Sequence, residues 1–204
     1  MTDADFTRAD VELLEQRTLW QGYYRMVLYR LRHRLHGGGW SGEIAREVFE
    51  RGHAAAVVPY DPLRDEVVLI RQFRPGAYAA RMGPWLWEII AGILEKDETP
   101  EALILREARE EAGLTLSDPI RIGKYLVSPG GTSESCTIFC ARVDAATASG
   151  IHGLKSENED IAVHALPYAR VMAMLAEEQI CNAKTIIGLQ WLALNRDSLR
   201  RQWQ

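Results

Sequence analysis

The sequence lacks the features that mark membrane, secreted and nucleic-acid-binding proteins. Its apolar runs are far shorter than the ~20 residues that a membrane-spanning helix needs, so we expect no membrane association. The opening stretch "MTDADFTRADVE" is acidic and has no apolar core, which predicts that no secretory signal is present. The net charge of −4 repels phosphate, so no nucleic-acid partner is expected. We therefore expect a cytoplasmic protein in which any phosphate ligand meets local positive charge or a metal ion.

Cysteine is also scarce, and neither cysteine nor histidine has the spacing of a metal site. The three cysteines are an odd number without a CxxC pair, which indicates reduced and mostly buried side chains. The five histidines show no ligand spacing either, so structural or surface roles are expected for each. These residues are Cys136, Cys140 and Cys181, and His33, His36, His53, His152 and His164.

The composition is that of an ordinary globular protein, with 47% hydrophobic and 25% charged residues. The glycine-rich stretch "HGGGWSG", residues 36–42, predicts a break between an N-terminal part, 1–42, and a main domain, 43–204. Before it, "YRLRHRLH" alternates arginine with leucine or histidine, which is the period of a half-buried strand. The N-terminal part should therefore form a small antiparallel β-sheet.

The main domain is expected to combine strands and helices in the α+β class. Two apolar strands in residues 52–76 are joined by a turn with Asp61, Pro62 and Asp65, and "WLWEIIAGI" reads as one further strand. Further strands are expected near 119–127, 136–144 and 161–166, and helices near 167–178 and 183–202. This order predicts a mixed sheet flanked by helices.

One more helix has clear boundaries in "TPEALILREAREEAG". Thr99 is a good N-cap, Pro100 a good first helical residue, and Gly113 a natural end. An apolar stripe should pack against the sheet. Its members are Leu105, Ala108 and Ala112.

Three glutamates of this helix, Glu107, Glu110 and Glu111, are spaced so that they share one face of one turn. Carboxylates so close together repel, and a divalent cation relieves that repulsion. Oxygen ligands without Cys or His select Mg²⁺ or Mn²⁺. Taken alone, however, three glutamates on a helix are more often a solvated face.

The wider spacing favours the metal site. Gly92, Glu98 and the run "REAREEAGL" from Arg106 to Leu114 match G-x5-E-x7-R-E-U-x-E-E-x-G-U at every specified position. This pattern is the Nudix box, so the chain resembles the Nudix family. The resemblance implies an α/β/α sandwich with a mixed sheet and an enzyme that hydrolyses a pyrophosphate joined to a nucleoside.

The box residues also make mechanical sense. Gly92 lets a loop fold back on the helix, Glu98 can reach Arg106, and Gly113 ends the helix. The resemblance implies that Glu107 and Glu111 hold the catalytic metals.

Within the family, the chain resembles the bacterial ADP-ribose pyrophosphatase group. The resemblance is carried by the segments "REVFERGHAA", "DEVVLIRQFR", "LVSPGGTSES", "ASGIHGLKSENEDI" and "LQWL". The resemblance implies ADP-ribose as substrate and a homodimer that exchanges its N-terminal parts. It adds Glu110 near the metals, the carbonyl of Ala91 and the carboxylate of Glu159 as metal ligands, and Glu157 as general base. The implied substrate contacts are Tyr23, Tyr24, Arg46, Arg51, Arg74, Ile93, Ser128, Pro129, Gly130 and Glu134. The tyrosines would reach the nucleotide from the partner subunit, although the family's aromatic pair often lacks hydroxyls.

The acidic segment "SENED", residues 156–160, is expected to be a loop that swings over the metal site. In an extended conformation Glu157 and Glu159 would point the same way, and we choose Glu157 as the base. The expected products are AMP and ribose 5-phosphate. Two alternatives stay open: a Nudix enzyme for another nucleotide sugar such as GDP-mannose, and a sensor that binds ADP-ribose without cleaving it.

Overall fold

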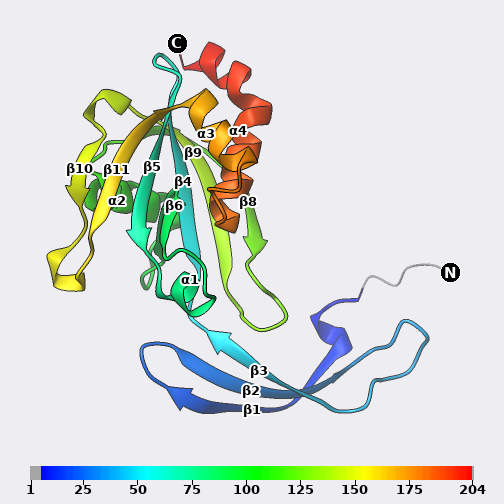
Figure 1. Cartoon of the computed structure of the whole chain (residues 1–204). Coiled ribbons are helices and arrows are strands. Elements are labelled where there is room, and N and C mark those ends of the chain that lie inside the picture. The colour runs from blue at the N-terminus through cyan, green and yellow to red at the C-terminus, as the bar shows by residue number, and fades with distance from the viewer. Residues whose placement is uncertain (1–5, 204) are drawn as a thin grey trace. The chain divides into compact units, whose positions relative to one another are not determined.

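The computed structural model describes residues 6–203, which form two sheets and four α-helices (Figure 1). Residues 1–5, on which the expectation of no secretory signal partly depends, lie outside the described residues. No helix within residues 6–203 is long and apolar enough to cross a membrane. In chain order the elements are β1 (Val11–Gln21), β2 (Arg25–His33), β3 (Ile44–Glu50), β4 (Ala54–Asp61), β5 (Glu66–Phe73), α1 (Pro75–Ala79), β6 (Trp85–Glu88), β7 (Ile90–Ile93), α2 (Pro100–Ala112), β8 (Ser117–Leu126), β9 (Ser135–Arg142), β10 (Ser149–His152), β11 (Ile161–Pro167), α3 (Tyr168–Ala176) and α4 (Ala183–Gln202).

The first compact unit contains an antiparallel sheet in the order β1-β2-β3, which confirms the predicted small sheet. The alternating arginines of β2 bind acidic side chains of the same unit. Arg30 forms ion pairs with Glu15 at 3.0 Å and Glu43 at 2.5 Å, and Arg32 pairs with Glu12 at 2.6 Å. These pairs explain the charge alternation along the strand.

The glycine-rich loop, residues 36–42, connects β2 to β3. Gly38 and Gly39 have positive φ angles of 91° and 78°, which glycine adopts without strain. The sequence predicts a division after this loop, and β3, which follows it, pairs with β2 along its whole length. Two compact units divide between His53 and Ala54, and residues 126–135 belong to the first unit.

The second unit contains a mixed sheet in the order β10-β11-β5-β4-β9-β8. Strands β4 and β9 are parallel, whereas β11 and β5 are antiparallel. The prediction of one strand for "WLWEIIAGI" is wrong. Its first half, β6, pairs with β5 and its second half, β7, pairs with β4, and Ile89 lies between them with its N–H donated to Thr185 Oγ1.

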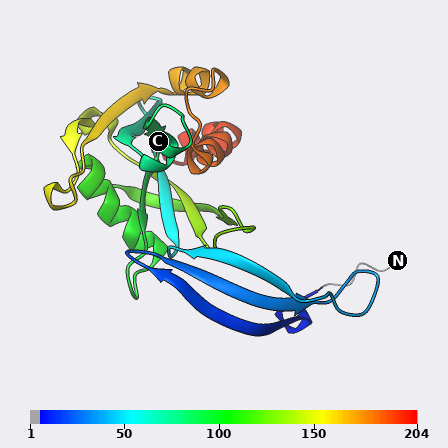
Figure 2. The ribbon, with the colours of Figure 1, turned by 60° about the horizontal axis from the view of Figure 1, so that its bottom comes forward.

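Helices cover both faces of this sheet, with α2 on one face and α3 and α4 on the other (Figure 2). The alternation along β4 explains the two layers, since Ala55 and Val57 pack toward α2 while Ala56 and Val58 pack toward α3 and α4. This confirms the α/β/α sandwich. The buried stripe of α2 also contains Leu103 and Ile104, which the sequence analysis left out.

Candidate functional site

The boundaries of α2 are set by the residues that the sequence predicted. Thr99 Oγ1 accepts a hydrogen bond from Ala102 N–H at 3.2 Å. Gly113 ends the helix with a φ of 65° and donates its N–H to the carbonyl of Arg109. A Cβ at Gly113 would lie 2.7 Å from the His152 ring, so glycine is required there for space as well as for conformation.

Arg106 fastens the preceding loop to α2. Its Nε and Nη2 donate to the two carboxylate oxygens of Glu98 at 3.0 and 3.1 Å. This pair raises the pKa of Arg106 and lowers the pKa of Glu98. Arg106 Nη1 also binds Glu107 at 3.0 Å and Glu110 at 2.8 Å. One guanidinium thus holds the loop and orients two of the three glutamates.

The side chains of Glu107 and Glu111 lie against the backbone of β7. Ala91 donates its N–H to Glu111 Oε2 at 3.2 Å, and Glu111 is only 3% exposed. A Cβ at Gly92 would lie 1.9 Å from Glu107 Oε1, so the missing side chain of Gly92 makes the space that Glu107 occupies. The structure therefore brings together three residues of the box, Gly92, Glu107 and Glu111, and the backbone of Ala91.

The surroundings of these two carboxylates disfavour negative charge. Burial, with repulsion from Glu110 and Glu159, raises the pKa of Glu107 to about 7 against the effect of Arg106. Burial, with repulsion from Glu107 and Glu159, raises the pKa of Glu111 to about 8. Both carboxylates would be stabilised by a nearby cation.

The acidic segment lies in the same unit as α2. Gly153, shortly before the segment in the chain, contacts α2 by donating its N–H to the carbonyl of Glu110 at 3.2 Å. Glu159 accepts a hydrogen bond from Leu154 N–H at 3.0 Å and is partly buried. Its repulsion of Glu107 and Glu111 indicates that it lies near them.

Glu157 is placed differently from Glu159. It is exposed, and its side chain has no hydrogen-bond or ion-pair partner within residues 6–203. The extended conformation considered for this segment is wrong, since Lys155–Glu157 form one turn of 3-10 helix and Asn158 has a φ of 55°.

The donor set at β7 and α2 fits Mg²⁺ or Mn²⁺, with two carboxylates beside a backbone carbonyl and no sulfur or imidazole. The space beside Gly92 and the mutual repulsion of Glu107 and Glu111 are what a cation site at this place requires. Within residues 6–203, no three Asp, Glu, His or Cys side chains form a ready-made metal cluster. Arg106 keeps the glutamates from forming such a cluster, because it binds Glu110 and one oxygen of Glu107.

A buried group that the sequence analysis missed lies beside this donor set. Glu88 is 1% exposed and binds Arg74, one of the predicted substrate-contacting arginines, at 2.6 Å. It also binds Lys184 at 3.1 Å and accepts a hydrogen bond from Asn182 at 2.6 Å. Arg74 lowers the pKa of Glu111, so its charge acts on the donor set. The signal available in the sequence was a single carboxylate inside the apolar run "WLWEIIAGI".

Several predicted substrate residues belong to the first compact unit, where three of them form a cluster. Arg51 Nη1 lies 3.4 Å from Glu134 Oε2, and the Arg51 guanidinium lies 5.3 Å from the centre of the Tyr24 ring. Tyr24 packs edge-on against Phe49 and Tyr23. Arg51 Nε is buried and has no hydrogen-bond partner among residues 6–203.

The other predicted contacts of this unit are exposed. Tyr23 is 90% exposed, and the Arg46 guanidinium donates a hydrogen bond to the neighbouring carbonyl of Ala45. Residues 128–130 form a turn in which the carbonyl of Ser128 accepts hydrogen bonds from Gly131 and Thr132. Ile93 belongs to the second unit, in β7, and is partly buried.

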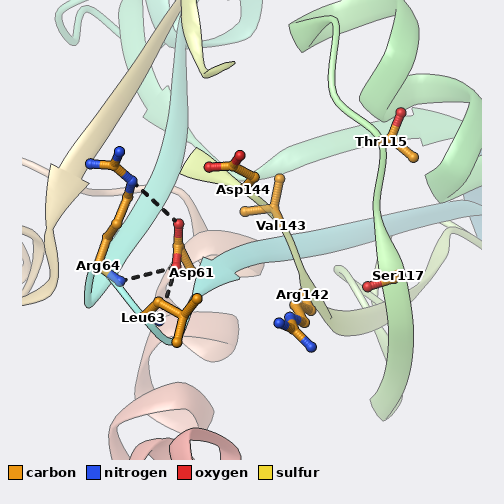
Figure 3. Close-up of a pocket in the computed structure, with 8 residues that line it drawn as sticks. All are labelled: Asp61, Leu63, Arg64, Thr115, Ser117, Arg142, Val143 and Asp144. Carbon is orange, nitrogen blue, oxygen red and sulfur yellow. Dashed lines mark hydrogen bonds and ion pairs between the residues drawn. The ribbon is translucent and has the colours of Figure 1, made fainter. Parts of the chain in front are cut away.

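A hollow of about 340 Å³ lies elsewhere in the second unit (Figure 3). One of its two carboxylates, Asp61, accepts hydrogen bonds from the N–H groups of Leu63, Arg64 and Ala145. None of the predicted site residues lines it. Its lining is Asp61, Leu63, Arg64, Thr115, Ser117, Arg142, Val143 and Asp144. The hollow is therefore separate from the residues that the sequence singled out.

Comparison with known proteins agrees with this geometry. A family model described as NUDIX domain matches residues 50–186. The chain is 48% identical over 198 residues to the ADP-ribose pyrophosphatase of Escherichia coli K12, covering 97% of this chain and 95% of that protein. It is 41% identical over 202 residues to the ADP-ribose pyrophosphatase of Haemophilus influenzae, covering 98% and 93%.

A second kind of relative is less similar. The chain is 34% identical over 191 residues to the GDP-mannose pyrophosphatase of Cronobacter sakazakii, covering 91% of this chain and 96% of that protein. A crystal structure of an ADP compounds hydrolase matches with a TM-score of 0.70 at 20% identity, over 95% of this chain and 96% of that one. This last match supports the fold alone.

Proposed function

Because the chain belongs to the Nudix family of hydrolases, as its sequence predicted, we propose that it hydrolyses ADP-ribose to AMP and ribose 5-phosphate with Mg²⁺ as cofactor. The observation that carries the proposal is the meeting of Glu107 and Glu111 with the backbone of Ala91 and Gly92. The high identity to two ADP-ribose pyrophosphatases supports the choice of substrate.

Mg²⁺, or Mn²⁺ in its place, would be held by the carboxylates of Glu107 and Glu111 and the carbonyl of Ala91. Glu159 would be a further ligand, and Glu110, which is held by Arg106, would lie near the ions. When bound, the ions neutralise the diphosphate and make water a better nucleophile. The chain supplies the rigid support, since α2 is fixed at both ends and Arg106 fastens its loop.

Glu157 is proposed to take the proton from the attacking water. Its exposed side chain has no partner within residues 6–203, so it is free to accept a proton. A carboxylate near cations is a weak base, so Glu157 contributes position as much as basicity.

The substrate contacts are proposed to include Arg74, Ile93 and the cluster of Tyr24, Arg51 and Glu134. We further propose that the protein is a cytoplasmic homodimer that exchanges its N-terminal parts, residues 1–42. In that assembly Tyr23 and Tyr24 would serve the partner subunit. The remaining proposed contacts are Arg46, Ser128, Pro129 and Gly130.

A panel of nucleotide sugars tests the substrate. ADP-ribose should have the highest kcat/KM, with AMP and ribose 5-phosphate as products. The 34% identity to a GDP-mannose pyrophosphatase makes GDP-mannose the competitor to include. A higher kcat/KM for GDP-mannose would replace ADP-ribose as the substrate, and binding of ADP-ribose without turnover would identify a sensor.

A further inference from the structure

The buried carboxylate of Glu88 connects three parts of the second unit. Its Oε2 binds Arg74 Nε at 2.8 Å and Nη2 at 2.6 Å, and accepts a longer hydrogen bond from Gln72 at 3.4 Å. Its Oε1 binds Lys184 Nζ at 3.1 Å and Asn182 Nδ2 at 2.6 Å. A carboxylate that is 1% exposed needs such partners, because an isolated buried charge is very costly.

These contacts fix the direction of the Arg74 guanidinium. Two of its nitrogens bind Glu88 Oε2, while Nη1 has no partner among residues 6–203. The Arg74 side chain is 36% exposed, so part of the planar group faces solvent. The remaining N–H groups are therefore free to bind oxygens of a ligand, on the side where the charge of Arg74 acts on Glu111.

The charges of the group leave a surplus of one positive charge. Arg74 and Lys184 contribute two positive charges and Glu88 one negative charge. Burial raises the pKa of Glu88, but Lys184 and Arg74 outweigh burial and keep the net pKa below its ordinary value. Without Lys184, the charge of Arg74 would be balanced by Glu88 alone.

The start of α4 holds this arrangement in place. Asn182 is the N-cap of the helix, and its Oδ1 accepts a hydrogen bond from Thr185 N–H while its Nδ2 binds Glu88. Thr185 in turn accepts the N–H of Ile89, next to Glu88 in the chain. Glu88 is thus supported from a helix that begins about 95 residues later.

We propose that Glu88 is a positioning residue for the hydrolysis, because it aims the Arg74 guanidinium at the diphosphate of the substrate. Lys184 balances the negative charge of Glu88, so that the group keeps one net positive charge to attract the diphosphate. This inference rests on the proposed function of the same site. It assigns a role to Glu88 and Lys184, neither of which belongs to the Nudix box.

A double-mutant cycle on the full chain tests the proposal, with kcat and KM measured for ADP-ribose. Glu88→Gln should lower kcat/KM about tenfold, mainly through KM, and Arg74→Ala about 10²-fold. The double variant should match Arg74→Ala within about twofold, because Glu88 acts only through Arg74. Independent, multiplying effects would overturn the proposal, as would tighter substrate binding by Glu88→Gln.

Lys184→Gln is a second variant that tests the same group of charges if Glu88→Gln does not fold. It leaves the Glu88–Arg74 pair in place and should raise KM about fivefold by removing the surplus charge. It should also have no further effect in the Arg74→Ala background. An unchanged KM for Lys184→Gln would contradict the role given to Lys184.

Asp65→Asn is the matched control, because Asp65 holds Arg196 by contacts of 2.7 and 2.5 Å, outside the donor set. Its φ of 57° suits asparagine. This variant should lower Tm and leave KM unchanged. A KM change equal to that of Glu88→Gln would mean that loss of stability, and not the position of Arg74, changes KM, which would contradict the proposal. Wild-type turnover is measured first: its absence refutes the proposed substrate, whereas normal wild-type turnover with independent variants refutes only the role of Glu88.

Discussion

The helix glutamates, Glu107 and Glu111, and the acidic segment, residues 156–160, carry the same functional group in opposite surroundings. Glu111 is almost fully buried and hydrogen-bonded by Ala91, and the pKa of both helix glutamates is raised. Glu157 is exposed and its side chain is free of partners within residues 6–203. We propose that the difference separates two tasks, because a rigid buried carboxylate suits a metal ligand and an exposed one suits a proton acceptor that must move.

Substitution of Glu111 should have the largest effect on activity. Glu111→Gln should lower kcat/KM for ADP-ribose about 10³-fold, since the metal is asked to supply several kcal/mol of charge stabilisation. The fold should persist, because a neutral amide is easier to bury than a carboxylate of raised pKa. Steady-state kinetics and circular dichroism measure the two effects.

Glu101→Gln is the matched control, since Glu101 is an exposed carboxylate in the first turn of the same helix. It should leave kcat/KM unchanged. Activity of Glu111→Gln near the wild-type level would remove Glu111 from the metal site.

Glu157→Gln should have the next largest effect, lowering kcat about 10²-fold through loss of the proton acceptor. Neither Tm nor Mg²⁺ affinity should change, because the side chain is exposed and lacks a partner within residues 6–203. Single-turnover kinetics and titration calorimetry with Mg²⁺ check the two halves of this prediction. Asp160→Asn, an exposed change in the same segment, serves as control, and a near-normal kcat for Glu157→Gln would shift attention to Glu159.

Gly92→Ala tests whether Glu107 must keep its position against β7. The added Cβ would lie 1.9 Å from Glu107 Oε1, so the Glu107 side chain must move. A displacement of about 1 Å at a reacting site can cost 10²-fold, and we expect kcat/KM to fall about tenfold to 10²-fold. The backbone of Gly92 does not have a positive φ, so the conformation itself suits alanine. Gly76→Ala, where a Cβ meets nothing within 4 Å, is the control.

Glu98→Gln should have the smallest effect on activity and a modest effect on stability, lowering Tm by a few degrees. Arg106 holds the pKa of Glu98 below its unfolded value of about 4.3. The stabilisation is therefore fully present above that pH and is lost as the pH falls through the lower, folded pKa. The Tm difference between wild type and variant should be constant from about pH 5 upward and shrink below about pH 4. A Tm difference that grows on acidification would contradict the pairing with Arg106.

The helix and its loop could be predicted because their determinants are local. Thr99, Gly113 and the Glu98–Arg106 pair lie within a few residues of the structure that they define. The alternation of β2 was equally readable, since Arg30 and Arg32 pair with Glu15 and Glu12 on the neighbouring strand β1.

What the sequence did not reveal depends on partners far apart in the chain. Glu88 meets Asn182 and Lys184 more than 90 residues later, and no spacing rule connects them. The break between β6 and β7 has a similar origin, because it depends on which neighbouring strand each half pairs with. The 3-10 turn at Glu157 was missed because loop conformation follows from such long-range packing.

We propose that Glu107 and Glu111 of α2 hold a metal ion that drives hydrolysis of ADP-ribose. The most direct measurement is turnover of ADP-ribose by the full chain with Mg²⁺, repeated after addition of EDTA and again after Mg²⁺ is restored. We predict formation of AMP and ribose 5-phosphate with Mg²⁺, none in EDTA, and recovery with added Mg²⁺. Turnover that persists in EDTA, or no turnover with either Mg²⁺ or Mn²⁺, would contradict it.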